Sequence, residues 1–146
     1  MTEPARGALP VDPETDRTWR PLDRAVVAAV FAGGALGGLA RYAVQAAFPV
    51  QLPAFPWPTL IINCSGAFAL AVLLVVLRRR SGWRLLRPLI GTGFLGGWTT
   101  FSAVVATADQ QLAHDHPAVA VGYLAASVGG GLSCAVAGFA LAGRSW

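Results

Sequence analysis

The chain has 146 residues, of which 55% are hydrophobic and only 12% are charged, and its formal net charge is +4. Soluble domains carry about 25% charged residues, so this composition excludes an ordinary soluble domain and indicates a membrane protein. The basic residues form no stripe interleaved with aromatic side chains, so they do not indicate nucleic-acid binding. We therefore expect a lipid bilayer, and no nucleic acid, around the protein.

Four apolar segments predict an all-α membrane protein. The predicted spans cover approximately residues 24–48, 57–77, 85–112 and 117–142. Each can supply the roughly 20 residues that a bilayer core requires of a helix. Residues 1–20 are rich in proline, threonine and charge and lack an apolar core, so we predict a disordered cytoplasmic tail there. Residues 21–146 then form one four-helix transmembrane domain.

The eleven basic residues are all arginine, and they predict how the spans are oriented. With four spans, the N-terminus, the second connection and the C-terminus share one side of the membrane. Ten of the eleven arginines fall on that side, and only Arg41 lies towards the other. Because positively charged connections are retained in the cytoplasm, we predict that both termini are cytoplasmic.

Glycines and other small residues recur at helical spacing in the first and fourth spans. Gly33 and Gly37 are four residues apart, as are Gly34 and Gly38. Small residues at this spacing allow helix backbones to approach closely in lipid. Four short helices can hardly enclose a shielded polar pathway by themselves, so we also expect an oligomer, most simply a two-fold dimer.

The polar residues inside the spans are mostly neutral, and no acidic residue lies near the middle of a span. A proton-coupled transporter usually needs a buried carboxylate, so this pattern argues against one. Amide and hydroxyl donors, together with the positive edge of the Phe101 ring, could instead hold an anion weakly enough for it to leave. These donors are Thr59, Asn63, Thr99, Thr100, Ser102, Tyr123 and Ser127. Taken singly, however, the hydroxyls are also consistent with bonds to carbonyls of their own helix, and Phe101 is more consistent with ordinary packing.

Three motifs together resemble one family. The stretch GFLGGWTTFSAV, residues 93–104, places glycines and hydroxyls inside an apolar span, and its GFLGGWTTFS part is similar to the third-helix signature of the CrcB/Fluc fluoride channels. PTLIINCSGAF, residues 58–68, resembles their second-helix motif, and GGALGGLARY, residues 33–42, their first-helix motif. Tyr123 and Ser127 fit the fourth-helix pattern. The resemblance extends over about residues 24–142.

The resemblance implies an antiparallel dimer of four-helix subunits, in which both subunits line two fluoride pores. It also implies a structural sodium ion at the dimer centre, held by backbone carbonyls of the broken third helix, which by motif match belong to Gly96 and Thr99. Unwinding at Gly96–Gly97 would free such carbonyls from helical bonds. Irregular backbone at membrane depth is tolerated where it is buried in protein or lines a cavity, and hard cations favour oxygen ligands.

The resemblance also assigns residues to a fluoride pathway. It implies that Asn63 donates a hydrogen bond to fluoride, that Phe101 turns towards a pore, and that Arg41 lies at an aqueous vestibule or anchors a helix end. A polar track would be completed by Thr59, Ser102, Tyr123 and Ser127. Because no chemistry on the ion is implied, we expect no enzyme. Fluoride would leave a bacterial cytoplasm passively through the plasma membrane, which reduces its toxicity.

Four positions depart from the family pattern. Val104 stands where a second phenylalanine is usual, and Val105 stands where a serine is usual. Thr107 replaces an acidic residue, and Gly131 occupies a place where a second hydroxyl often follows Ser127. A pore that relied on these groups would be incomplete.

These departures and the arginine bias suggest a heterodimer. A subunit that inserts in both orientations should have balanced charges, whereas this chain is strongly biased to one orientation. We therefore expect it to pair with a homologous, oppositely oriented subunit. Two alternatives remain open: a non-conducting assembly subunit of such a channel, and a small multidrug-type four-helix transporter, which would need a membrane-embedded carboxylate.

Overall fold

A computed structural model of this chain describes residues 23–78 and 84–144. The predicted tail and part of the arginine-rich second connection lie outside these described residues. Four helical segments are long and apolar enough to cross a membrane, at Arg24–Ala47, Trp57–Leu77, Arg87–Ala113 and Pro117–Arg144. The predicted all-α architecture with four transmembrane helices is thereby confirmed.

The third span is interrupted, as the sequence predicts, and the other three are continuous. Its first part is wound as a π-helix and passes directly into a short α-helix, and a non-helical stretch separates these from a final α-helix. In chain order the elements are α1 (Arg24–Ala47), α2 (Trp57–Arg78), η1 (Arg87–Leu95), α3 (Gly96–Trp98), α4 (Ser102–Ala113) and α5 (Pro117–Arg144).

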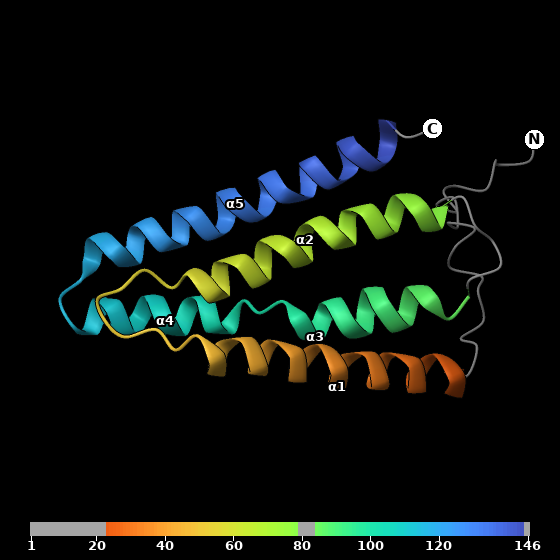
Figure 1. Cartoon of the computed structure of the whole chain (residues 1–146), viewed down its shortest axis with the longest axis horizontal. Coiled ribbons are helices and arrows are strands. Elements are labelled where there is room, and N and C mark those ends of the chain that lie inside the picture. Colours follow the sequence, from red (N-terminus) through yellow and green to blue (C-terminus); the bar gives the residue numbers. More distant parts are fainter. Residues whose placement is uncertain (1–22, 79–83, 145–146) are drawn as a thin grey trace, which may run out of the picture.

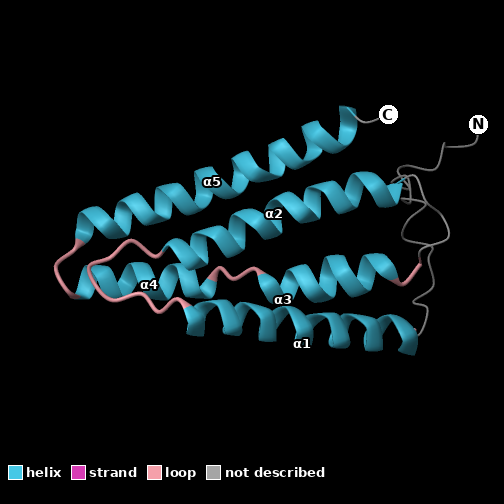
Figure 2. Ribbon diagram, viewed as in Figure 1, coloured by secondary structure: helices cyan, strands magenta, loops and turns pink. Residues whose placement is uncertain are grey.

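The spans alternate in direction, so that α1 begins and α5 ends at the same end of the bundle (Figure 1). Packing does not follow the order of the chain, because α2 packs mainly against α5, and α1 packs mainly against η1 and α3. The two members of each pair therefore run in the same direction. The loops at residues 48–56 and 114–116 lie together at the opposite end (Figure 2).

Glycines bring α1 into backbone contact with the third span. Gly33 and Gly37 are buried, and a Cβ atom at either position would overlap a carbonyl oxygen, that of Leu89 or Phe94 respectively. Across the same contact, a Cβ atom at Gly97 would overlap the Gly34 carbonyl oxygen. The close approach that the glycine spacing predicts is thus used within the subunit.

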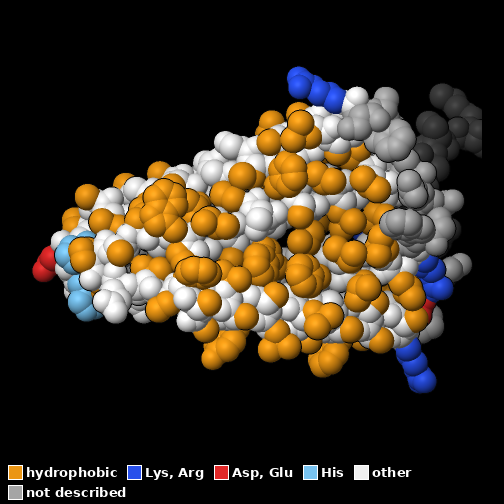
Figure 3. Space-filling model, viewed as in Figure 1, with side chains coloured by type: hydrophobic (Ala, Val, Ile, Leu, Met, Phe, Trp, Pro, Cys, Tyr) orange, Lys and Arg blue, Asp and Glu red, His pale blue; other side chains and the backbone are white. Residues whose placement is uncertain are grey.

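The outer surface is largely apolar, as expected for a protein that faces lipid. Figure 3 shows hydrophobic side chains along the length of the bundle, with charged and histidine side chains at its ends. Only 6% of the most apolar window of α5 is buried within the subunit. A small internal core forms where α4 and α5 meet, and it consists of Val104, Ala108, Ala120 and Tyr123, with Phe55 and Leu60 packed against it.

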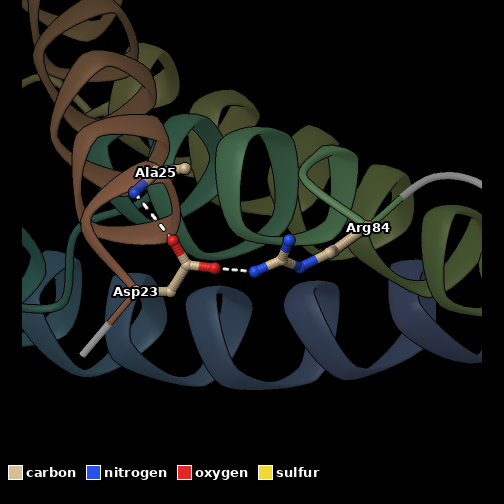
Figure 4. A network of polar contacts seen from close by, with 3 residues as sticks. All are labelled: Asp23, Ala25 and Arg84. Carbon is tan, nitrogen blue, oxygen red and sulfur yellow. Dashed lines mark hydrogen bonds and ion pairs between the residues drawn. The ribbon is translucent and has the colours of Figure 1, made fainter. Parts of the chain in front are cut away.

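A polar contact joins the starts of the first and third spans (Figure 4). The Asp23 carboxylate caps α1 by accepting a hydrogen bond from the Ala25 amide at 3.0 Å, and its other oxygen pairs with Arg84. The Arg84 side chain is 72% exposed, so this ion pair contributes little stability. The cap still defines where α1 begins.

We predict that Gly37→Ala destabilises the protein, because the added methyl group would overlap the Phe94 carbonyl oxygen and push α1 away from η1. Overpacking of this kind costs about 1–3 kcal/mol. Thermal unfolding of the purified protein in detergent would measure the loss. Gly38→Ala is the matched control, because a Cβ atom there meets nothing within 4 Å. Equal melting temperatures for the two variants would contradict the prediction.

Candidate functional site at the break in the third span

The helix breaks at Thr99 and Thr100. The Thr99 amide and hydroxyl both donate to the Leu95 carbonyl, at 3.0 and 2.9 Å, and thereby close the last turn of α3. The Thr99 backbone is then extended, with φ −77° and ψ 154°. Helical bonding resumes where the Val105 amide donates to the Phe101 carbonyl at 3.1 Å.

The break lies three residues later than the sequence suggests, because Gly96 and Gly97 are helical rather than unwound. The expected unwinding at Gly96–Gly97 is therefore wrong. Gly97 meets a packing requirement instead, since α1 approaches so closely that no side chain fits there. A glycine pair in a span thus marks a helix contact here, and the break depends on a different residue.

Asn63 of α2 takes over the backbone bonds that the break removes. Its side-chain oxygen accepts from the Thr100 amide at 2.8 Å, and its side-chain nitrogen donates to the Thr100 carbonyl at 2.9 Å. Because a backbone group unpaired in lipid costs several kcal/mol, this reciprocal pair is what makes the extended residues tolerable at membrane depth. The Asn63 amide retains a second N–H donor.

Thr100 also starts the next helix. Its hydroxyl accepts from the Ala103 amide at 3.1 Å, which is the bond that a capping residue makes to the first turn of a helix. The same hydroxyl lies 3.2 Å from the hydroxyl of Ser102. Ser102 is therefore engaged at the start of α4.

Arg41 of α1 reaches the other side of the break. Its Nε donates to the Gly97 carbonyl at 3.0 Å, and the residue is partly buried. The C-terminal end of a helix carries a partial negative charge, so a guanidinium beside the end of α3 is favourable. The structure thus places Arg41 at the broken helix, bonded to the end of α3.

Gly96 and Thr99 are among the residues whose backbone carbonyls lose their helical donors at the break. The Thr100 amide, which would bond to the Gly96 carbonyl in a continuous helix, donates to Asn63. The Ala103 amide, which would bond to the Thr99 carbonyl, donates to the Thr100 hydroxyl. A Cβ atom at Gly96 would meet nothing within 4 Å, so its surroundings are open. Carbonyl oxygens released in this way suit a hard cation, so the residues present fit a sodium site.

A cavity of about 590 Å³ lies beside the break, and both of these residues line it. Its wall is mostly apolar, includes a few hydroxyl and amide groups and the Phe101 ring, and has no charged side chain. The Phe101 side chain is 74% exposed on the single subunit, which places its ring in the open. The residues that line it include Asn63, Gly96, Thr99, Thr100, Phe101 and Gly131.

A second group of predicted residues lies apart from this cavity. Thr59 and Tyr123 are buried, with 6% and 0% exposure, and the Tyr123 hydroxyl lies next to the side chains of Thr59 and Ser127. Among the described residues, neither the Tyr123 hydroxyl nor the Ser127 hydroxyl makes a hydrogen bond of good geometry, although the two groups lie close together. The structure therefore divides the predicted polar track into a cavity at the break and a buried hydroxyl cluster nearer the loops at residues 48–56 and 114–116.

The structure shows contacts of two residues, Val104 and Gln45, that the sequence does not predict. Val104 is 3% exposed and packs in the core with Tyr123, so its reduced size is accommodated inside the subunit. Gln45 of α1 donates to the Thr59 hydroxyl over a long distance of 3.5 Å. Gln45 lies four residues after Arg41, so the two share one face of the first helix. This spacing could have indicated from the sequence that Gln45 belongs to the site.

The fold and the site together define a class: small integral membrane proteins of four helices with a polar break in the third. The chain belongs to the CrcB family, because the family model described as "CrcB-like protein, Camphor Resistance (CrcB)" matches residues 28–139.

Curated relatives carry a more specific name. The fluoride-specific ion channel FluC 3 of Streptomyces avermitilis is 45% identical over 121 residues, which cover 82% of this chain and 59% of the relative. FluC 1 of Mycolicibacterium paratuberculosis is 45% identical over 73% of this chain and 81% of the relative. FluC 2 of Nocardia farcinica is 40% identical over 81% of this chain and 85% of the relative. The chain thus spans less than two thirds of the first relative and most of the other two.

We predict that Asn63→Leu destabilises the fold, because it leaves the Thr100 amide and carbonyl without partners. Each buried group left unsatisfied costs about 1–3 kcal/mol. Denaturant unfolding in detergent would measure the loss. Thr92→Val is the matched control, because Thr92 lines the same cavity and is exposed. If both variants were as stable as the parent, Asn63 would not be what stabilises the break.

Proposed function

We propose that this chain is a subunit of a fluoride-specific ion channel, which lets fluoride leave the bacterial cytoplasm passively across the plasma membrane. The observation that carries the proposal is the uncharged cavity of about 590 Å³ at the break, where Asn63, Thr100 and the exposed Phe101 meet. Neutral donors beside a ring edge can replace part of the water around a small anion without trapping it. The names of the relatives support fluoride as that anion.

Within this proposal, the second N–H of Asn63 and the ring edge of Phe101 contact fluoride, and Ser102, Thr59, Tyr123 and Ser127 belong to the polar track. Arg41 holds the end of α3 through the Gly97 carbonyl. The second alternative, a multidrug-type transporter, is not favoured, because the acidic residues of the described chain lie near helix ends: Asp23, Asp109 and Asp115.

We further propose that the functional unit is an antiparallel dimer with a homologous, oppositely inserted subunit. The arginine bias supports one orientation for this chain, with both termini cytoplasmic. Relatives numbered FluC 2 and FluC 3 occur in the same organism, Streptomyces avermitilis, which supports pairing between different subunits. The open cavity and the exposed Phe101 on the isolated subunit support a partner at this face.

One observation favours a second candidate, a non-conducting assembly subunit. Val104 fills the subunit core, and Gly131 leaves the cavity wall without a side chain. Such a chain would complete the fold of its partner, and the conducting groups would come from the partner.

We predict rapid fluoride efflux, with chloride retained, from liposomes that contain this chain and its homologous partner, and none from liposomes that contain the chain alone. A fluoride electrode reads the efflux. Fluoride-conducting dimers formed by the chain alone would overturn the heterodimer. If no homologous partner gave fluoride efflux, the proposal that this chain is a channel subunit would be overturned.

Phe101→Ile is expected to reduce the fluoride efflux of the assembled complex at least about tenfold, which corresponds to one lost anion contact. Phe31→Ile is the matched control, because Phe31 is 78% exposed on α1 and is not part of the cavity wall. If Phe101→Ile left efflux unchanged while the complex still conducted, the assembly-subunit candidate would be favoured.

We propose that a sodium ion at the centre of the dimer is held by the Gly96 and Thr99 carbonyls together with carbonyls of the partner subunit. The ion would supply a positive charge that holds the two broken helices together. The diversion of the Thr100 and Ala103 amides supports this proposal, because it releases those two carbonyls.

Replacement of sodium by N-methyl-D-glucamine is therefore expected to lower the melting temperature of the complex and its dimer fraction in size-exclusion chromatography. A ligand present at 100 times its Kd stabilises the state that binds it by about 2.7 kcal/mol, so the shift is measurable. If melting temperature and dimer fraction stayed unchanged, no structural sodium would be bound.

A further inference from the structure

A second cavity, of about 170 Å³, lies where the ends of α1 and α4 meet the start of α2. Four polar side chains line it, Gln45, Thr59, Thr107 and Gln110, and its other lining residues are apolar or proline. No charged side chain takes part. Val50, Leu52 and Pro56 of the connection of residues 48–56 also line the cavity. That connection lies at the end of the bundle opposite the start of α1 (Figure 1).

Gln45 and Thr59 connect this cavity to the interior. The Gln45 side-chain nitrogen lies 3.5 Å from the Thr59 hydroxyl oxygen and donates to it. Thr59 is only 6% exposed, whereas Gln45 is partly open, so Gln45 is the outer member of the pair. The Thr59 hydroxyl accepts from Gln45 and keeps its own proton to donate further inward.

The groups further inward are hydroxyls with unused bonding capacity. The Tyr123 hydroxyl lies next to the side chains of Thr59 and Ser127. Both the Tyr123 and the Ser127 hydroxyls are fully buried, and although they lie close to each other, neither makes a hydrogen bond of good geometry among the described residues. Buried polar atoms without partners are rare and call for an unseen ligand or water. A row of donors thus leads from the cavity into the bundle.

We propose that Gln45 and Thr59 form an entrance site for a small hard anion, through which fluoride passes between the aqueous phase and the buried hydroxyls of Tyr123 and Ser127. This inference rests on the proposed channel function and adds a binding residue to it, Gln45. An amide has two N–H donors, so Gln45 can bond to Thr59 and to the anion together. Because Thr107 is neutral, the cavity wall has no carboxylate that would repel an anion.

The first test is Gln45→Leu, which removes the amide at nearly constant volume, measured as fluoride efflux of the assembled complex in liposomes. Loss of one hydrogen bond to the ion is expected to slow efflux about tenfold. Gln51→Leu is the matched control, because Gln51 is an exposed glutamine of the nearby connection that does not line the cavity. Efflux through the control should match the parent.

The second test distinguishes an entrance from a purely structural contact. A negatively charged methanethiosulfonate reagent should block fluoride efflux through Gln45→Cys when it is added from one side of the membrane only. The parent, which retains Cys64 and Cys134, gives the background. A merely structural Gln45 would not produce a block that depends on the side.

The outcomes separate this inference from the channel proposal. If the parent complex conducts and Gln45→Leu conducts as well as Gln51→Leu, the entrance site is overturned and the channel stands. Absence of any block of Gln45→Cys from either side would overturn it as well. If no complex of this chain conducts fluoride, both the channel and the entrance site fail.

Discussion

The reciprocal bond between the Asn63 side chain and the Thr100 backbone is the interaction on which the rest of the site depends. Lipid offers no hydrogen bonds, so a membrane helix can stop only where protein groups replace its backbone partners. The amide side chain of Asn63 supplies an acceptor for the Thr100 N–H and a donor for the Thr100 carbonyl. Because Thr100 is held there, its hydroxyl can start α4, the Gly96 and Thr99 carbonyls are released, and Phe101 is left in the open.

The first helix restrains the break from the opposite side. Glycines on α1 and on the third span allow the two backbones to touch, and this contact brings Arg41 within 3.0 Å of the Gly97 carbonyl. A longer separation would leave a guanidinium in lipid without a partner, which is costly. The Arg41 bond therefore depends on the glycine contact. The first helix holds α3 through Gly97, and α2 holds the extended residues after α3 through the bond of Asn63 to Thr100.

The number of spans, the break in the third and the neutral character of the site could be predicted from the sequence, because all three depend on composition and on local motifs. The position of the break could not. Glycine permits both unwinding and close packing, and only the α1 contact shows that Gly97 serves packing. Hydrophobicity also cannot distinguish the lipid-facing side of a span from its core, so the burial of Val104 against Tyr123 and the contact of Gln45 with Thr59 required the structure.

The small share of α5 that is buried within the subunit has an evolutionary consequence. A helix whose surface is mostly free of its own subunit can accept substitutions without disturbing the Asn63–Thr100 bond or the glycine contact. After duplication, two copies of such a chain can therefore diverge along α5 and come to prefer each other, while both retain the same break. The choice of partner can then change through the exposed residues of α5, while the break in the third span and the α5 residues that face inward, such as Tyr123, stay the same.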